Sequence, residues 1–262
     1  NINFIWRHGN SLREDDELGI AEANNNVVNY IRLAFSKFAK KSGNKYLVEK
    51  TEANTLRIGF VNKIFPHAKF IFVVRDGRDA IASMLNRRKQ PLDLTFLLKK
   101  AQFIPVSDIP VVIYRYIKNI IRRYFFKSKG NYYLGPIYKG MEKELKNYTE
   151  DEIVALQWAT CIKKANEDLK KIDSNRVHII KYEEFVKTPF EEITALFKYV
   201  DIDTDTEESK SIMNKILCAE MGKETASPEM KLVKGISDKS VGRWKKQLDT
   251  KTIKQSPIKL SS

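Results

Sequence analysis

Short apolar runs alternate along the chain with longer segments whose apolar residues recur at helical spacing. Lys69–Val74 is an apolar run without polar alternation, a pattern that predicts a strand buried on both faces, as in a parallel sheet. Tyr46–Glu49 and Val177–Lys181 are predicted as two further strands. The segment from 46 to 74, about 30 residues, has the size of a βαβ crossover.

Helical periodicity fills the spaces between these runs. Helices are predicted over Asn54–Phe65, Glu152–Lys171 and Pro189–Tyr199, the last beginning with a proline, which is favourable at a helix start. A further helix is expected from about Asp79 to Arg87. Strands that alternate with helices predict an α/β fold with a parallel sheet flanked by helices.

Residues 99–150 interrupt this alternation. Within them, Val111–Lys127 is rich in aromatic and basic residues, and we interpret the region as a helical insertion, not as a separate domain. The expected organisation is therefore one domain over residues 1–262 with a frayed, Lys- and Ser-rich tail from about residue 249.

Composition narrows the classes of partner. Of 262 residues 42% are hydrophobic, and the net charge is +14, which implies anionic partners. Two cysteines without metal-ligand spacing and three dispersed histidines predict no metal site. The two cysteines are interpreted as free thiols of a reducing compartment, so we expect a cytoplasmic protein, and the first residues lack the features of a signal peptide.

The strongest chemical signal is Arg75-Asp76-Gly77-Arg78-Asp79, directly after the predicted strand. Two arginines at the carboxyl end of a parallel strand, beside the unpaired N–H groups of a helix start, predict an anion site. Ser83, two turns along, would add a hydroxyl donor. The alternative is a surface turn in which the arginines pair with the two aspartates.

The stretch from Phe65 to Met84 resembles the 3′-phosphate-binding segment of the sulfotransferases that use 3′-phosphoadenosine 5′-phosphosulfate. Its form is similar to the protein-tyrosine sulfotransferases and their bacterial relatives. The resemblance implies that Arg75 and Ser83 hold the 3′-phosphate and that Arg87 also contacts the nucleotide. It further implies the P-loop nucleoside-triphosphate-hydrolase-like fold of this family.

Further segments extend the resemblance. Lys50, at the end of the preceding predicted strand, falls where the family has a lysine that offsets negative charge on the oxygen bridging sulfur and phosphorus. Tyr182 falls where a tyrosine lies against the nucleotide. The segment 234–245 is similar to the closing motif of the family, which implies nucleotide contacts from Lys234, Ser240 and Arg243.

The family's 5′-phosphosulfate loop does not occur in the 262 residues, and the resemblance places it upstream of Asn1. It places the catalytic base, a glutamate in many members, at or before Asn1. His8 is the nearest substitute, although a structural histidine is the simpler interpretation, and Arg7 would reach an acidic acceptor.

The predicted function is transfer of a sulfuryl group from this nucleotide, without a metal, to a hydroxyl of a peptide tyrosine, a glycan or a small molecule. Three alternatives stay open: a basic nucleic-acid-binding module, a membrane-surface module that uses 111–127, and a P-loop nucleotide kinase. Our default for 111–127 is that its apolar side packs on the core. No nucleic-acid partner is expected, and the sequence does not indicate an oligomeric state.

Overall fold

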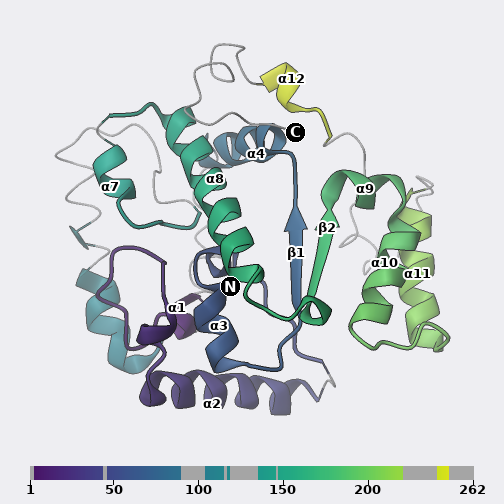
Figure 1. Cartoon of the computed structure of the whole chain (residues 1–262), viewed down its shortest axis with the longest axis horizontal. Coiled ribbons are helices and arrows are strands. Elements are labelled where there is room, and N and C mark those ends of the chain that lie inside the picture. Colours follow the sequence, from purple (N-terminus) through teal and green to yellow (C-terminus); the bar gives the residue numbers. More distant parts are fainter. Residues whose placement is uncertain are drawn as a thin grey trace. The chain divides into compact units, whose positions relative to one another are not determined.

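The computed structural model describes residues 3–43, 46–89, 104–114, 117–118, 135–145, 147–220 and 241–247 (Figure 1). The chain divides into two compact units. The first unit comprises residues 1–68 and 84–171, and the second comprises 69–83 and 172–262. Helix α4 (Gly77–Lys89) begins in the second unit and continues into the first.

The described part of the first unit is helical. Its elements are α1 (Asn3–Trp6), η1 (Ile20–Glu22), α2 (Asn25–Ser42), η2 (Glu52–Leu56), α3 (Ile58–Ile64), η3 (Val106–Asp108), α7 (Met141–Glu144) and α8 (Glu150–Leu169). The longest, α8, begins with a capping box in which Thr149 and Glu152 satisfy each other's backbone N–H groups. Helix α2 starts at an Asn24 cap and ends at Gly43, whose φ of 66° is a left-handed conformation that glycine adopts without strain.

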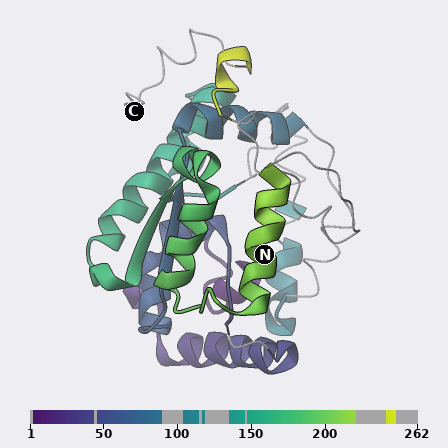
Figure 2. The same ribbon diagram turned by 90° about the vertical axis from the view of Figure 1, so that its right-hand side faces the viewer.

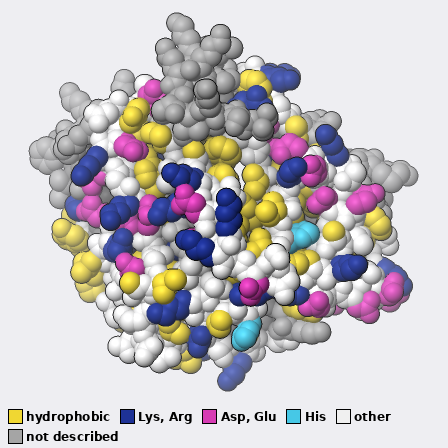
Figure 3. Space-filling view, viewed as in Figure 1, with side chains coloured by type: hydrophobic (Ala, Val, Ile, Leu, Met, Phe, Trp, Pro, Cys, Tyr) yellow, Lys and Arg dark blue, Asp and Glu magenta, His cyan; other side chains and the backbone are white. Residues whose placement is uncertain are grey.

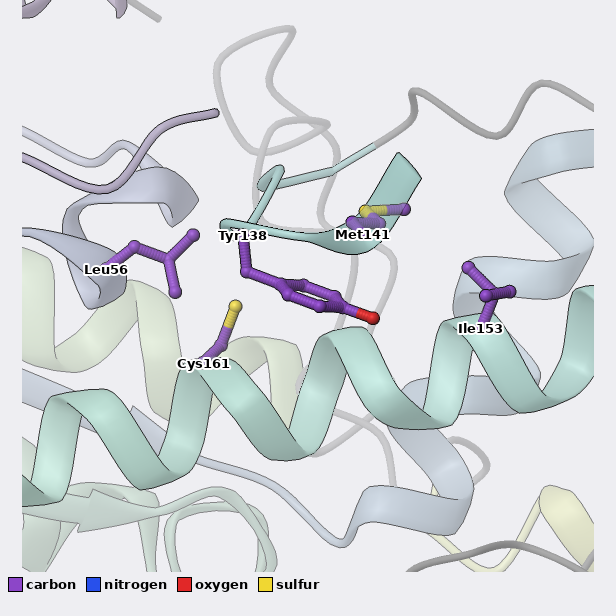
Figure 4. Packing of buried hydrophobic residues seen from close by; sticks show 5 residues of the cluster. All are labelled: Leu56, Tyr138, Met141, Ile153 and Cys161. Carbon is purple, nitrogen blue, oxygen red and sulfur yellow. The ribbon is translucent and has the colours of Figure 1, made fainter. Parts of the chain in front are cut away.

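Two hydrophobic groups stand out in the core that the described residues of this unit form. The ring of Trp6, 1% exposed, packs edge-on against Phe35, Phe60 and Phe65, with centroids 5.1, 6.4 and 6.0 Å away. A second cluster comes from η2, α7, α8 and the loop before α7 (Figure 4). Its members are Leu56, Tyr138, Met141, Ile153 and Cys161. Burial raises the pKa of the Cys161 thiol to about 11, as expected of a structural cysteine.

A buried polar network accompanies that core. The Arg7 guanidinium donates to the Asp16 carboxylate over 2.6 Å, and Arg57, 0% exposed, donates to the Asn3 and Asn54 side chains. Burial alone would raise the pKa of Asp16. The positive charge of Arg7 and the hydrogen bond from the Ile137 N–H outweigh this effect, so the pKa lies below its usual value. Burial lowers the pKa of Arg57 to about 10. Arg7 is thus paired with Asp16, and Arg57 is hydrogen-bonded to two amide side chains, so the network links segments of the unit that are distant in sequence.

The second unit contains the sheet. Strands β1 (Phe70–Val74) and β2 (Val177–Lys181) are parallel, with Phe70 opposite Val177 and Val74 opposite Lys181. After β2 come α9 (Tyr182–Lys187), α10 (Pro189–Tyr199) and α11 (Glu207–Glu220), while η4 (Ser174–Arg176) precedes it. Helices α10 and α11 pack against each other, and α11 faces the viewer in Figure 2. A short helix, α12 (Trp244–Gln247), completes the described elements.

The predicted α/β class and most predicted elements are confirmed. The strands at 69–74 and 177–181 and the helices at 152–171 and 189–199 match β1, β2, α8 and α10 within two residues. The helix predicted over Asn54–Phe65 exists as η2 followed by α3. The α4 helix begins at Gly77, two residues before the predicted start.

Two predictions about strands are wrong. Residues 46–50 form no strand, and Val48 is 81% exposed, because a strand needs a partner for its backbone groups and the described residues offer none there. The expected burial of β1 on both faces is also wrong. Ile71 and Val73 are 39% and 57% exposed, so the face of β1 that carries these two side chains is largely open to solvent.

The predicted insertion at 99–150 is described in part, and its described residues include η3 and α7. Ile113, Tyr114 and Ile117 are exposed, so the expected packing of this apolar side on the core is not seen for these residues. The tail from 249 lies outside the described residues. Among those that are described, no helix has the length and apolar character needed to cross a membrane. The single-domain organisation stays a prediction.

Candidate functional site

The carboxyl ends of the two strands bring Arg75 and Tyr182 together. Val74 and Lys181 form the last register pair, so the residues that follow them leave the sheet at the same edge. The Arg75 guanidinium lies 4.8 Å from the centroid of the Tyr182 ring, and both side chains are half-buried. Here the parallel pairing joins two residues that are 107 positions apart in sequence, in the kind of position where open α/β sheets bind ligands.

Two carboxylates fix the turn between β1 and α4. The Glu183 side chain accepts the Asp76 N–H over 2.9 Å, which ties the end of β1 to the start of α9. Asp76 in turn caps α4, because its carboxylate accepts the Arg78 N–H over 2.9 Å. The expectation of an unpaired helix start is therefore wrong for this N–H, since a side chain of the motif itself occupies it.

Arg78 is part of this scaffold. Its guanidinium binds the Asp76 carboxylate at 2.6 Å and lies 4.4 Å from the centroid of the Trp244 ring. Hydrogen bonding with Arg78 lowers the pKa of Asp76 and raises the pKa of Arg78. The surface-turn alternative therefore holds for Arg78, which pairs with Asp76, whereas Arg75 lies against an aromatic ring.

Asp79 makes the most distant connection in sequence. It is 2% exposed, and its two carboxylate oxygens accept the N–H groups of Gly242 at 2.7 Å and Trp244 at 2.9 Å. These belong to residues 241–247, which we call the closing segment. Gly242 has a φ of 71°, a left-handed conformation suited to glycine. The first turn of α4 thus binds the closing segment in two ways: through the Asp79 carboxylate, and through the Arg78 guanidinium over the Trp244 ring.

Ser83 lies on the second turn of α4, where its side chain is exposed. Arg75, Tyr182 and Ser83 all belong to the second unit, and together they offer a forked cationic donor, a flat ring and a hydroxyl. This donor set suits a phosphate attached to a nucleoside, because a guanidinium binds two phosphate oxygens at once and a ring packs against the base or sugar.

Lys50 and Arg87 belong to the first unit. The Lys50 side chain is 84% exposed, and its ammonium lies 3.6 Å from the Glu52 carboxylate. The preceding Glu49 accepts hydrogen bonds from the Thr51 hydroxyl and the Asn54 amide, which fix the turn that presents Lys50. Arg87 is exposed near the end of α4.

The side chains of Arg7 and His8, near the N-terminus, make contacts within the protein. Arg7 is 5% exposed and binds Asp16 and two backbone carbonyls, so the expectation that it reaches an acceptor is wrong. His8 stacks on Tyr30 with a centroid distance of 3.6 Å, and its Nδ1 lies 3.3 Å from Asp108. These contacts agree with a structural role for His8.

The remaining predicted residues are in the C-terminal part. Arg243 is exposed within the closing segment, whereas Lys234 and Ser240 lie outside the described residues. The described residues contain no group of three His, Cys, Asp or Glu side chains that could hold a metal. On the face shown in Figure 3, the coloured Lys and Arg side chains are interspersed with Asp and Glu, so the positive charge of the chain is divided among small patches there.

Sequence reasoning assigned no role in the candidate site to Asp79, Glu183 or Trp244, although each lies within a motif that resembles the family. The position of Asp79 was informative, because a carboxylate beside an expected anion site would repel the anion. Its presence there indicates another interaction. The sequence around Glu183 and Trp244 does not indicate which residues they contact. Their contacts depend on segments that meet only in the folded unit.

Two comparisons with known proteins address the family. Residues 10–99 match the sulfotransferase family. Over 88 residues the chain is 35% identical to protein-tyrosine sulfotransferase 1 of Danio rerio, an alignment that covers 32% of this chain and 24% of that protein. The chain thus matches about a quarter of the length of this relative. No solved structure matches the chain. The two matches support assignment of the chain to the sulfotransferase family.

Proposed function

We propose that this protein transfers a sulfuryl group from 3′-phosphoadenosine 5′-phosphosulfate to an acceptor hydroxyl. The observation that carries the proposal is the placement of Arg75 against Tyr182 at the carboxyl end of the parallel sheet, with Ser83 on the helix that follows. The family match supports a transferase, and the sulfotransferase family generally uses this donor. We further propose one domain over residues 1–262 with the P-loop-like fold of the family, in the cytoplasm.

In this proposal Arg75 and Ser83 bind the 3′-phosphate, and Tyr182 packs against the nucleotide. Arg87, Arg243, Lys234 and Ser240 contribute further contacts to it.

In the reaction the acceptor oxygen forms a bond to sulfur, and the bond from sulfur to the bridging phosphate oxygen breaks. The products are a sulfate ester and 3′-phosphoadenosine 5′-phosphate, and the hydroxyl proton passes to a base. Negative charge grows on the bridging oxygen, so a fixed cation there lowers the barrier. Lys50, exposed on a turn held by Glu49, is the proposed cation. No step uses a metal.

The acceptor is proposed to be a hydroxylated and acidic molecule. The net charge of +14 favours an anionic partner, and the name of the Danio rerio relative refers to protein tyrosine. A tyrosine in an acidic peptide is therefore the first acceptor to assay, followed by glycans and small hydroxylated molecules.

Nucleotide binding tests the proposal most directly. Isothermal titration of the chain with 3′-phosphoadenosine 5′-phosphate and with adenosine 5′-phosphate isolates the contribution of the 3′-phosphate. We expect the 3′-phosphorylated nucleotide to bind about 10- to 100-fold tighter, because a hydrogen bond to a charged group contributes about 1.5–3 kcal/mol. Arg75→Ala should remove this preference. Equal binding of the two nucleotides, or a preference that survives Arg75→Ala, would overturn the proposal.

A further inference from the structure

Asp79 is the acidic residue that the proposed anion site would be expected to avoid. It lies four residues after Arg75 and four before Ser83, and it is 2% exposed. A buried carboxylate near a bound phosphate would repel it, and burying a charge without partners is unfavourable. Its presence there calls for a compensating interaction.

That interaction comes from the closing segment. The N–H groups of Gly242 and Trp244, at 2.7 and 2.9 Å, bind different oxygens of the same carboxylate. Trp244 is the first residue of α12, so Asp79 supplies this short helix with the acceptor that a capping side chain normally provides. Both partners and Asp79 belong to the second unit.

The geometry constrains the residue between the two donors. Arg243 is held on both sides, by the Gly242 N–H and by the Trp244 N–H, and its own side chain is exposed. The ring of Trp244 is fixed in addition by the Arg78 guanidinium at 4.4 Å. Three contacts from one helix turn therefore set the backbone orientation at Arg243.

We propose that Asp79 is a positioning residue of the nucleotide site: it anchors the closing segment to the first turn of α4 and thereby orients Arg243 toward the nucleotide. This inference rests on the proposed function for the identity of the ligand. The anchoring itself rests only on the contacts of Asp79.

The substitution Asp79→Asn distinguishes a positioning role from the alternative, in which Asp79 is a bystander, that is, a carboxylate with no role in nucleotide binding. Asparagine keeps one oxygen acceptor but presents an NH₂ group to the second N–H, so the anchor is broken on one side. It also removes a negative charge beside the phosphate. A bystander carboxylate therefore predicts tighter nucleotide binding after the substitution, whereas a positioning residue predicts weaker binding.

Two measurements on the whole chain test the inference. Hydrogen exchange should show the Gly242 and Trp244 amides protected in the wild type and exchanging at least about 10-fold faster in Asp79→Asn. Titration with 3′-phosphoadenosine 5′-phosphate should show about 10-fold weaker binding. Asp173→Asn, the same change at an exposed aspartate of the second unit, is the matched control and should alter neither.

A double-mutant cycle tests whether Asp79 acts through Arg243. Arg243→Ala should weaken nucleotide binding in the wild type and have much less effect in the Asp79→Asn background. Gly242→Ala gives a second route to the same result if Asp79→Asn fails to fold. At a φ of 71° a Cβ strains the turn, although it meets no atom within 4 Å, so the closing segment should loosen without a clash.

The outcomes distinguish the two proposals. Amides that stay protected in Asp79→Asn overturn the anchor. Amides that lose protection while nucleotide binding stays equal or tightens overturn the positioning role, and so do additive effects of Asp79→Asn and Arg243→Ala. A wild-type chain that does not bind the nucleotide overturns the proposed function and with it the role toward a nucleotide, while the exchange result still decides whether Asp79 anchors the segment.

Discussion

The two ends of the small parallel sheet carry similar residues in different arrangements. At the carboxyl end Arg75 lies 4.8 Å from the Tyr182 ring, and at the amino end Arg176 lies 5.8 Å from the Phe70 ring. Both ends also have a basic residue bound to an aspartate: Arg78 to Asp76, and Lys69 to Asp201. Charge and aromatic content therefore do not distinguish the ends.

What distinguishes them is the direction of the strands. The carboxyl end continues into α4, a 13-residue helix whose first turn is capped by Asp76 and binds the closing segment through Asp79. At the amino end, Lys69 donates to the Tyr199 carbonyl at 2.6 Å and to Asp201, so its contacts stay within the protein. A helix start offers partial positive charge to an anion, which the amino end of a strand does not. Strand direction is therefore the reason why we assign Arg75, and not Arg176, to the proposed binding site.

Charge reversal at the two ends should produce the largest difference. Arg75→Glu is expected to weaken binding of 3′-phosphoadenosine 5′-phosphate by about 100-fold or more, because a contribution of about 1.5–3 kcal/mol is replaced by repulsion. Arg176→Glu should change binding by less than about twofold, since the added charge at the other end is screened. Titration calorimetry measures both. Similar losses for the two variants would show that overall charge, not the site, controls binding.

A smaller effect is expected from the hydroxyl on the second turn of α4. Ser83→Ala should weaken nucleotide binding by about 10-fold, as for the loss of one hydrogen bond to a charged group. Ser174→Ala removes an exposed hydroxyl from η4, just before the amino end of β2, and should have no effect. If Ser83→Ala binds as tightly as the wild type, Ser83 is not a phosphate ligand.

The smallest expected effect concerns stability in acid. The pKa of Asp76 is held below its usual 3.8, first by the hydrogen bond from the Arg78 side chain. Its contribution is therefore complete above about pH 4 and is lost as the pH falls through the lowered value. Asp76→Asn keeps a capping oxygen but loses the negative charge beside Arg78, so this pH-dependent share, about 1 kcal/mol or less for a partly exposed ion pair, should disappear.

The pH-dependent contribution of Asp76 to stability can be measured by urea unfolding between about pH 2.5 and 6, a range that includes the titration of aspartates. Asp201→Asn is the matched variant at the amino end, where an exposed ion pair contributes less than about 1 kcal/mol. A wild type and an Asp76→Asn variant with parallel pH dependence would exclude Asp76 as an acid-labile cap.

Local pattern was enough to predict most of the elements and the segment that carries the candidate site. The apolar runs at 69–74 and 177–181 predicted β1 and β2, and helical spacing predicted α8 and α10, because side-chain periodicity follows directly from local backbone geometry. The Arg75–Asp79 motif indicated the turn after β1 for the same reason. Where a strand depends on a distant partner, as at Tyr46–Glu49, the same pattern failed.

Only the tertiary structure decided which partner each charged residue of that turn has. Arg75 meets Tyr182, Arg78 meets Asp76 and Trp244, and Asp79 meets the closing segment 163 and 165 positions away in sequence. It also decided that Arg7, next to the predicted acceptor site, is enclosed with Asp16. The sequence specifies which chemical groups are present and how they are spaced. A hydrogen bond has a short range and a strict direction, so the packing of distant segments decides which of these groups pair.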